Sequence, residues 1–136
     1  MKMKRKMKRE DVKLLIEDIC ARMPYGIKCF IPEINSVRKL AAIHYDCENT
    51  LFDFLDESNT QYEYQLYKSE FKPYLIPESN MSFEQEEEIY DICKYHEIGY
   101  EPKLPKLIDF YNRNHIDYRG LIEKGLALDA TGLNIY

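Results

Sequence analysis

A change of pattern between residues 71 and 96 constrains this chain more than any other feature of its sequence, because a strand-rich half gives way there to a helical half. Pro73 and Pro77 each fix a φ angle and push the preceding residue toward extended backbone. No helix can therefore run through this stretch. We expect the chain to turn here between a sheet and a helical layer.

Capping signals after the second proline predict a helix. Ser82 and Gln85 have the spacing of a reciprocal capping box, so the helix should begin near Phe83. The positive end of the helix dipole stabilises carboxylates in the first turns, and four lie there: Glu84, Glu86, Glu87 and Glu88. The apolar positions predict one narrow buried stripe, formed by Phe83, Ile89, Ile92, Cys93 and His96.

Helical spacing also predicts an N-terminal helix that opens at residues 9–11 and ends at Pro24 and Gly26. One face of this helix is apolar: Val12, Leu15, Ile16, Ile19 and Met23. We expect that face to pack on the protein's own sheet, with a partner helix as the alternative.

The hydrophobic period changes toward two from Ile27 onward, which is typical of strands. Four strands are expected, near residues 27–31, 37–45, 51–55 and 62–66. The connections between them are short, which favours an antiparallel meander of three or four strands. A meander curled into a small, partly closed barrel is the alternative, and no parallel βαβ unit is visible.

Two or three helices should follow the meander. After the helix at Phe83, the next should start near Pro105 with four apolar residues directed inward: Leu104, Leu107, Ile108 and Tyr111. Asp117 can cap a further short helix that ends at Gly125. The predicted fold is thus α+β, with one domain over residues 10–136 and a disordered basic tail over residues 1–9.

Length and composition fit one globular domain, because 136 residues with 45% hydrophobic and 13% aromatic side chains can bury a core. The sequence has no run of eighteen apolar residues and no signal segment, so we expect no membrane span. Four cysteines without framework spacing predict free thiols in a reducing compartment, which favours a cytoplasmic location. They are Cys20, Cys29, Cys47 and Cys93.

The net charge of −5 hides an asymmetry. Residues 1–9 carry six of the nineteen basic residues and no acid, which leaves thirteen basic against twenty-four acidic residues in the rest of the chain. Binding to a nucleic-acid backbone depends on cationic contacts, so the acidic body argues against it. Nucleic acid is expected only through the tail, from Lys2 to Arg9.

Three stretches resemble a family of small uncharacterised proteins encoded in phages and prophages of gut Bacteroidetes. They are MPYGI at residues 23–27, KPYLIP at 72–77 with Ser79, Met81 and Ser82 after it, and DYRGLIEKGLA at 117–127. The chain departs from that family at Ile76, where arginine is common, and in lacking tryptophan. The resemblance implies a mobile-element setting and no particular reaction.

Two Cys/His pairs are weak candidates for a metal site or a catalytic couple. His44 and Cys47 are three residues apart, as are Cys93 and His96, so four tetrahedral zinc ligands would result if the pairs met. The alternative places Cys93 in a buried stripe, His96 at a helix end and His44 half exposed on a strand. No glycine-rich loop or nucleophile motif is present, so we predict no catalytic residue, no metal and no cofactor.

Two groups of residues are candidates for binding a partner. Tyr118, Arg119 and Lys124 could present an aromatic ring and cations to a partner, and capping with internal packing explains them equally well. Glu84, Glu87 and Glu88 could bind a basic partner or form a solvated helix start.

The resulting hypothesis is a non-enzymatic phage or prophage accessory protein that binds a host or phage protein. The alternative is an acidic nucleic-acid mimic that blocks a host DNA- or RNA-binding factor. Self-association stays open.

Overall fold

The computed structural model describes residues 8–46, 49–55, 61–65, 71–95 and 103–136. The described part contains three α-helices: α1 (Arg9–Arg22), α3 (Phe83–Tyr95) and α4 (Lys103–Arg113). Its strands are β1 (Lys28–Ile31), β2 (Ser36–Asp46), β3 (Asn49–Leu55), β4 (Gln61–Gln65), β5 (Lys72–Pro77), β6 (Ile116–Asp117) and β7 (Leu128–Asp129). Short 3₁₀ turns lie at Met23–Tyr25, Pro32–Ile34 and Glu78–Asn80. None of these helices has the length and apolar character needed to cross a membrane.

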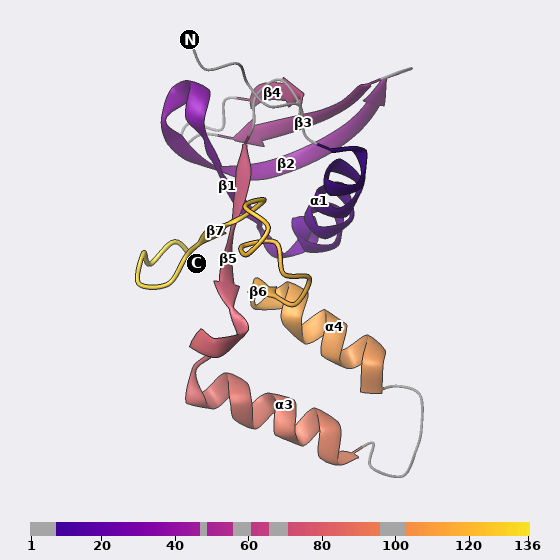
Figure 1. Cartoon of the computed structure of the whole chain (residues 1–136), viewed down its shortest axis with the longest axis vertical. Coiled ribbons are helices and arrows are strands. Elements are labelled where there is room, and N and C mark those ends of the chain that lie inside the picture. The colour runs from indigo at the N-terminus through magenta and orange to yellow at the C-terminus, as the bar shows by residue number, and fades with distance from the viewer. Residues whose placement is uncertain (1–7, 47–48, 56–60, 66–70, 96–102) are drawn as a thin grey trace.

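The strands join in one open, mixed sheet with the order β4-β3-β2-β1-β5-β6, and β7 also pairs with β5 (Figure 1). β1 to β4 form the predicted antiparallel meander. The α+β class is therefore confirmed, but the expectation of a purely antiparallel sheet of three or four strands is wrong, and the sheet does not close into a barrel. Both β6 and β7 run parallel to β5.

The parallel pairing arises from a crossover that the sequence patterns did not reveal. The chain leaves β5, forms α3 and α4, and returns to place Ile116 beside Ile76. Parallel neighbours need such a long connection. A two-residue strand such as β6 carries too little alternation to be recognised in the sequence.

β5 is extended through both prolines, as their φ preference requires, yet it lies between other strands. Proline cannot donate a ladder hydrogen bond and is normally confined to strand ends and edges. β5 meets this constraint by pairing with three strands in succession along its length. Only residues 72–73 pair with β1, while residues 74–75 pair with β7 and residues 76–77 with β6.

A β-bulge in β2 changes which side chains face the core. The register with β3 shifts between Leu40 and Ala42. An extra residue reverses the alternation, so that Leu40 and Ile43, three positions apart, both contact the hydrophobic core. Strict alternation along β2 would have placed these two side chains on opposite faces.

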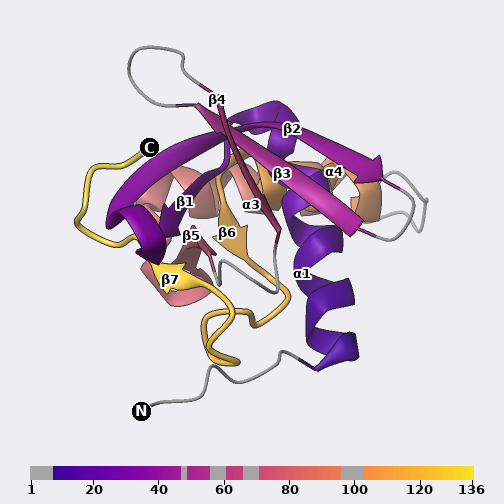
Figure 2. The ribbon, with the colours of Figure 1, turned by 90° about the horizontal axis from the view of Figure 1, so that it is seen from above.

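The core lies between α1 and the curved meander, where α1 packs beside β2 and β3 (Figure 2). Leu15 and Ile19 supply the helix side and are fully buried, as the helical spacing predicted. The centre is aromatic, because Phe71 meets Phe52 and Phe54 edge to face with ring centroids 5.0 Å apart in each case. Edge-to-face pairs are a favoured aromatic geometry.

The helices following β5 match the sequence only in part. α3 begins at Phe83 as predicted, and α4 begins at Lys103, two residues before Pro105. Among the side chains of α4 that the structure describes, Phe110 is the one that is fully buried, and the predicted inward set omitted it. The short helix expected after Asp117 is a series of turns instead, although Gly125 has the expected left-handed backbone, with φ of 76°.

Candidate functional site

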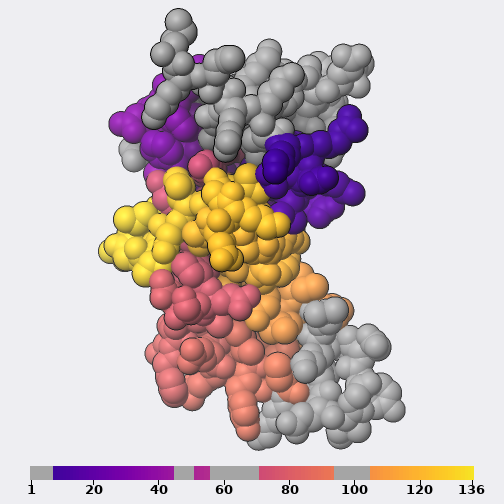
Figure 3. All heavy atoms as spheres, in the orientation of Figure 1, coloured from indigo at the N-terminus to yellow at the C-terminus, as the bar shows by residue number. Residues whose placement is uncertain are grey.

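α3 forms one end of the molecule, and its outer side faces away from the rest of the chain (Figures 1 and 3). The capping box that starts it is formed, since Ser82 N–H donates to Gln85 Oε1 at 2.9 Å and Gln85 N–H donates to Ser82 Oγ at 3.2 Å. The start of this helix is therefore fixed by local hydrogen bonds. Sequence alone predicted this feature correctly.

The outer side of α3 carries two large aromatic side chains in water. Phe83 is 69% exposed and Tyr90 is 66% exposed. The prediction that Phe83 belongs to the buried stripe is therefore wrong. Its place in the helix explains why: at 100° per residue Phe83 lies opposite Ile92, and Ile89 and Ile92 are the partly buried side chains.

Carboxylates surround the two aromatic residues. Five acidic side chains of α3 are exposed: Glu84, Glu86, Glu87, Glu88 and Asp91. Glu88 accepts a hydrogen bond from Arg113 of α4 at 2.7 Å. Gln85 donates to Asn114 at 3.4 Å, so two polar contacts attach the inner side of α3 to α4 and the residue after it. Glu87 therefore lies on the outer side, Glu84 is exposed at its margin, and Glu88 is held by an ion pair.

A buried ion network, which sequence reasoning missed, joins α1 to the C-terminal segment. Asp18 and Arg22 are fully buried, and Arg22 Nε lies 3.0 Å from both carboxylate oxygens of Asp18. Arg22 also donates to the carbonyl oxygens of Tyr111 at 3.2 Å and Ile116 at 2.6 Å. Asp18 and Arg22 are three and seven residues after Leu15, so helical spacing did place this charged pair on the apolar face.

Only some of the predicted partner-binding residues of the C-terminal segment make contacts in or beside this network. Arg119 donates to Asp18 at 2.6 Å, across 101 residues of sequence. Tyr118 stacks on Tyr111 with centroids 5.3 Å apart, and the Arg119 guanidinium lies 4.4 Å from the Tyr118 ring centroid. Internal packing therefore accounts for Tyr118 and Arg119. Lys124 is exposed on the following turn.

The Cys/His candidates are distributed over distant elements. β2 and α3, which carry His44 and Cys93, lie at opposite ends of the molecule (Figure 1). His44 Nε2 is 2.7 Å from Asp53 Oδ2. Cys47 and His96 are outside the described residues. The described part of the chain contains no group of three or more His, Cys, Asp or Glu side chains that could hold a metal ion.

The cysteines in the described residues differ in environment. Cys29 is buried in the core, and this burial raises the pKa of its thiol, with the nearby Asp18 carboxylate acting in the same direction. Cys20 is exposed on α1 and Cys93 is partly buried on α3. A thiol with a raised pKa is a poor nucleophile at neutral pH. Cys29 therefore acts as a small core residue.

Comparison with protein-family models, with curated proteins and with solved structures finds no match to this chain in any of the three. The geometry of the side chains therefore carries the functional argument. Among the sites predicted from sequence, the glutamates of α3 are exposed on the same helix as two exposed aromatic side chains.

Proposed function

We propose that this chain is a non-enzymatic accessory protein that binds another protein through the outer face of α3. The observation that carries the proposal is the exposure of Phe83 and Tyr90, at 69% and 66%, on one side of a well-formed helix. The resemblance to small phage and prophage proteins fits an accessory role of this kind, with a host or phage protein as the partner.

Phe83 and Tyr90 form a pair that one partner can contact at once. Seven residues make almost two helical turns, so the two side chains lie about 20° apart around the helix axis and about 10.5 Å apart along it. Glu87 lies between them on the same side. Anchors with this spacing are typical of an amphipathic helix that binds in a groove of its partner.

The chemistry of these residues fits a binding surface. Large aromatic side chains are enriched among the residues that dominate binding energies, because they bury a large area with few rotatable bonds. α3 is held in place by its capping box and by the Glu88–Arg113 ion pair. Such preorganisation lowers the entropy lost on binding.

The charge around the aromatic pair defines the partner. At 100° per residue, Glu86 and Glu87 lie on the same side of α3 as the two rings, and Glu84 and Asp91 are exposed at the margin of that side. A partner with an apolar groove and a basic rim matches both features, since electrostatic complementarity steers association and excludes acidic surfaces.

The test compares the full chain with the Phe83→Ala/Tyr90→Ala double variant. A photoreactive phenylalanine analogue at position 90 is cross-linked in lysate to identify the partner protein. That partner is then purified separately, and its affinity for the full chain and for the double variant is measured by titration calorimetry. Removing two anchors should weaken binding at least tenfold. Leu133→Ala is the matched control, because Leu133 is 52% exposed on the C-terminal turn. Equal affinity of the double variant and wild type would refute the proposal.

The nucleic-acid mimic is the second candidate, favoured by the exposed carboxylates of α3. A mimic would lose affinity when Glu84 and Glu87 become glutamine, and its affinity would fall steeply with salt. An interface centred on Phe83 and Tyr90, with the carboxylates only at its rim, should lose much less affinity as the salt concentration rises. The same calorimetric titrations at two salt concentrations therefore separate the two candidates.

A further inference from the structure

Two lysines meet on one face of the sheet. Lys28 of β1 and Lys39 of β2 are direct cross-strand partners in the antiparallel ladder. Side chains in such positions start only about 5 Å apart at their Cβ atoms, and like charges placed there repel. The fold therefore tolerates a local concentration of positive charge in a chain whose net charge is −5.

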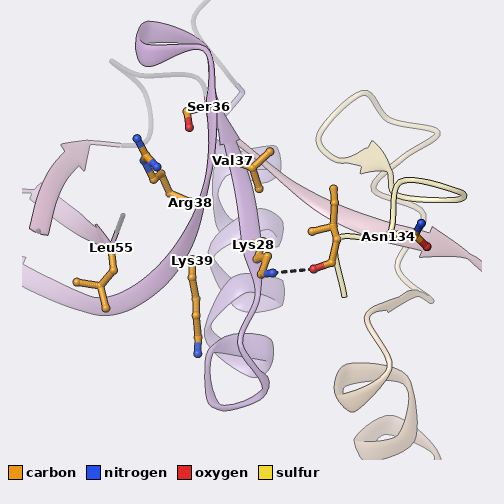
Figure 4. A pocket seen from close by; sticks show the side chains of 8 residues that line it. Lys28, Ser36, Val37, Arg38, Lys39, Leu55 and Asn134 are labelled. Atoms are coloured by element: carbon orange, nitrogen blue, oxygen red, sulfur yellow. Dashed lines mark hydrogen bonds between the residues drawn. The ribbon is translucent and has the colours of Figure 1, made fainter. Parts of the chain in front are cut away.

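Both lysines line a pocket of about 490 Å³ between β1, β2 and the C-terminal segment (Figure 4). Its volume is in the range of small-molecule sites. None of the described residues that line it is acidic. The polar side chains are Lys28, Ser36, Arg38, Lys39 and Asn134, and the apolar ones are Val37, Leu55 and Ile135.

The two ammonium groups have different surroundings. Lys28 Nζ donates to the Ile135 carbonyl oxygen at 2.6 Å and lies 6.0 Å from the Tyr136 ring centroid, which fixes its position. An ammonium has three donors, so two remain. Lys39 makes no hydrogen bond or ion pair with any residue that the structure describes. Its chain end lies near Gly26, where an added Cβ would be 3.4 Å from Lys39 Cε.

Arg38 belongs to the same pocket but not to this pair. It is the cross-strand partner of Cys29, which is fully buried. Successive side chains of a strand point to opposite faces, so Lys28 and Lys39 share one face while Cys29 and Arg38 share the other. Figure 4 shows the Arg38 side chain directed away from Lys28.

We propose that this pocket binds the oxyanion head of a small organic ligand, with the head between Lys28 and Lys39. Val37 and Leu55, which lie on the same face of the sheet as the two lysines, and Ile135 face the apolar body of the ligand. An oxyanion between the two ammonium groups turns their repulsion into two attractive contacts. The site is separate from α3, so it does not depend on the proposed protein-binding function.

Phenyl phosphate, benzoate and inorganic phosphate are the probes, each titrated into the full chain and followed by amide chemical shifts in NMR. The largest shifts should fall on β1 and β2 around Lys28 and Lys39. Phenyl phosphate should bind at least tenfold more tightly than inorganic phosphate, because only the former uses the apolar wall. The comparison of phenyl phosphate with benzoate identifies which oxyanion the site prefers.

Lys39→Met is the main variant, because Lys39 has no hydrogen-bond or ion-pair partner among the described residues whose loss would disturb the fold. Binding of the preferred probe should fall at least tenfold, and Lys39→Arg should restore it. Lys124→Met, which removes an exposed lysine elsewhere, should leave affinity within twofold of wild type. The proposal is overturned if Lys39→Met binds like wild type, if Lys124→Met weakens binding equally, or if phenyl phosphate and inorganic phosphate bind alike.

Discussion

His115 is a buried histidine whose surroundings favour its neutral form. Its side chain is only 5% exposed, and its ring stacks on Tyr136 with centroids 3.7 Å apart. The pKa of His115 is lowered to about 4, mainly by burial and also by the positive charges of Arg22 and Lys28, while a hydrogen bond with the backbone of Tyr25 opposes the shift in part. The histidine is therefore uncharged in the folded protein at neutral pH.

The lowered pKa makes stability depend on pH in a defined window. Unfolded histidine has its ordinary value of 6.5, so between about pH 6.5 and 4 the unfolded chain binds more protons than the folded one, and stability falls as the pH falls. From these two pKa values the loss is about 2 kcal/mol between pH 7 and pH 5, and about 3 kcal/mol once the pH falls below 4. This is a large part of the 5–15 kcal/mol that typically holds a domain folded.

The assay is urea unfolding of wild type and His115→Asn at several pH values between 5 and 7. Asparagine suits the backbone, because His115 has φ of 57° and asparagine tolerates the left-handed region. The variant loses the ring stacking at every pH, which lowers its free energy of unfolding by a constant amount. The informative quantity is therefore how the difference in free energy of unfolding between wild type and variant changes with pH. That difference should shrink by about 2 kcal/mol from pH 7 to pH 5. A constant difference, or an NMR titration of the His115 ring with a pKa between 6 and 7, would refute the reasoning.

Two further predictions concern stability. Arg22→Met leaves the carboxylate of Asp18 buried with Arg119 as its remaining charge partner. It should lower the free energy of unfolding, measured in urea, by about 3–5 kcal/mol. Arg113→Met breaks the exposed ion pair between α4 and α3 and should lower it by no more than about 1 kcal/mol, so equal losses would contradict the assigned role of the buried network. Ser82→Ala removes one half of the capping box and should lower the free energy of unfolding by about 1 kcal/mol, so an unchanged urea midpoint would show that this cap does not stabilise α3.

Local sequence signals were sufficient for features that one element forms by itself. The Ser82 and Gln85 pair predicted the start of α3, and the hydrophobic period of two from Ile27 onward predicted the strand at β1. Helical spacing predicted the burial of Leu15 and Ile19. In each case the hydrogen bonds or the periodicity involve residues a few positions apart.

The candidate protein-binding site was only half predictable. The sequence predicts the carboxylates of Glu84 and Glu87 as a possible partner surface, but the rough three-to-four spacing of apolar positions places Phe83 in the buried stripe. The helical period places Phe83 and Tyr90 opposite Ile92. That signal was present in the sequence, but which side of α3 meets α4 depends on contacts between elements.

The amino-acid sequence by itself determined the class of fold, the helix that follows the two prolines and the acidic character of its surface. Only the tertiary structure decided that β5 pairs with three strands, that Arg119 reaches Asp18 across 101 residues, and that Lys28 and Lys39 are cross-strand partners. The physical reason is the range of the interactions. Capping and periodicity act over one or two turns, whereas strand register and buried ion pairs depend on which distant segments exclude water from each other.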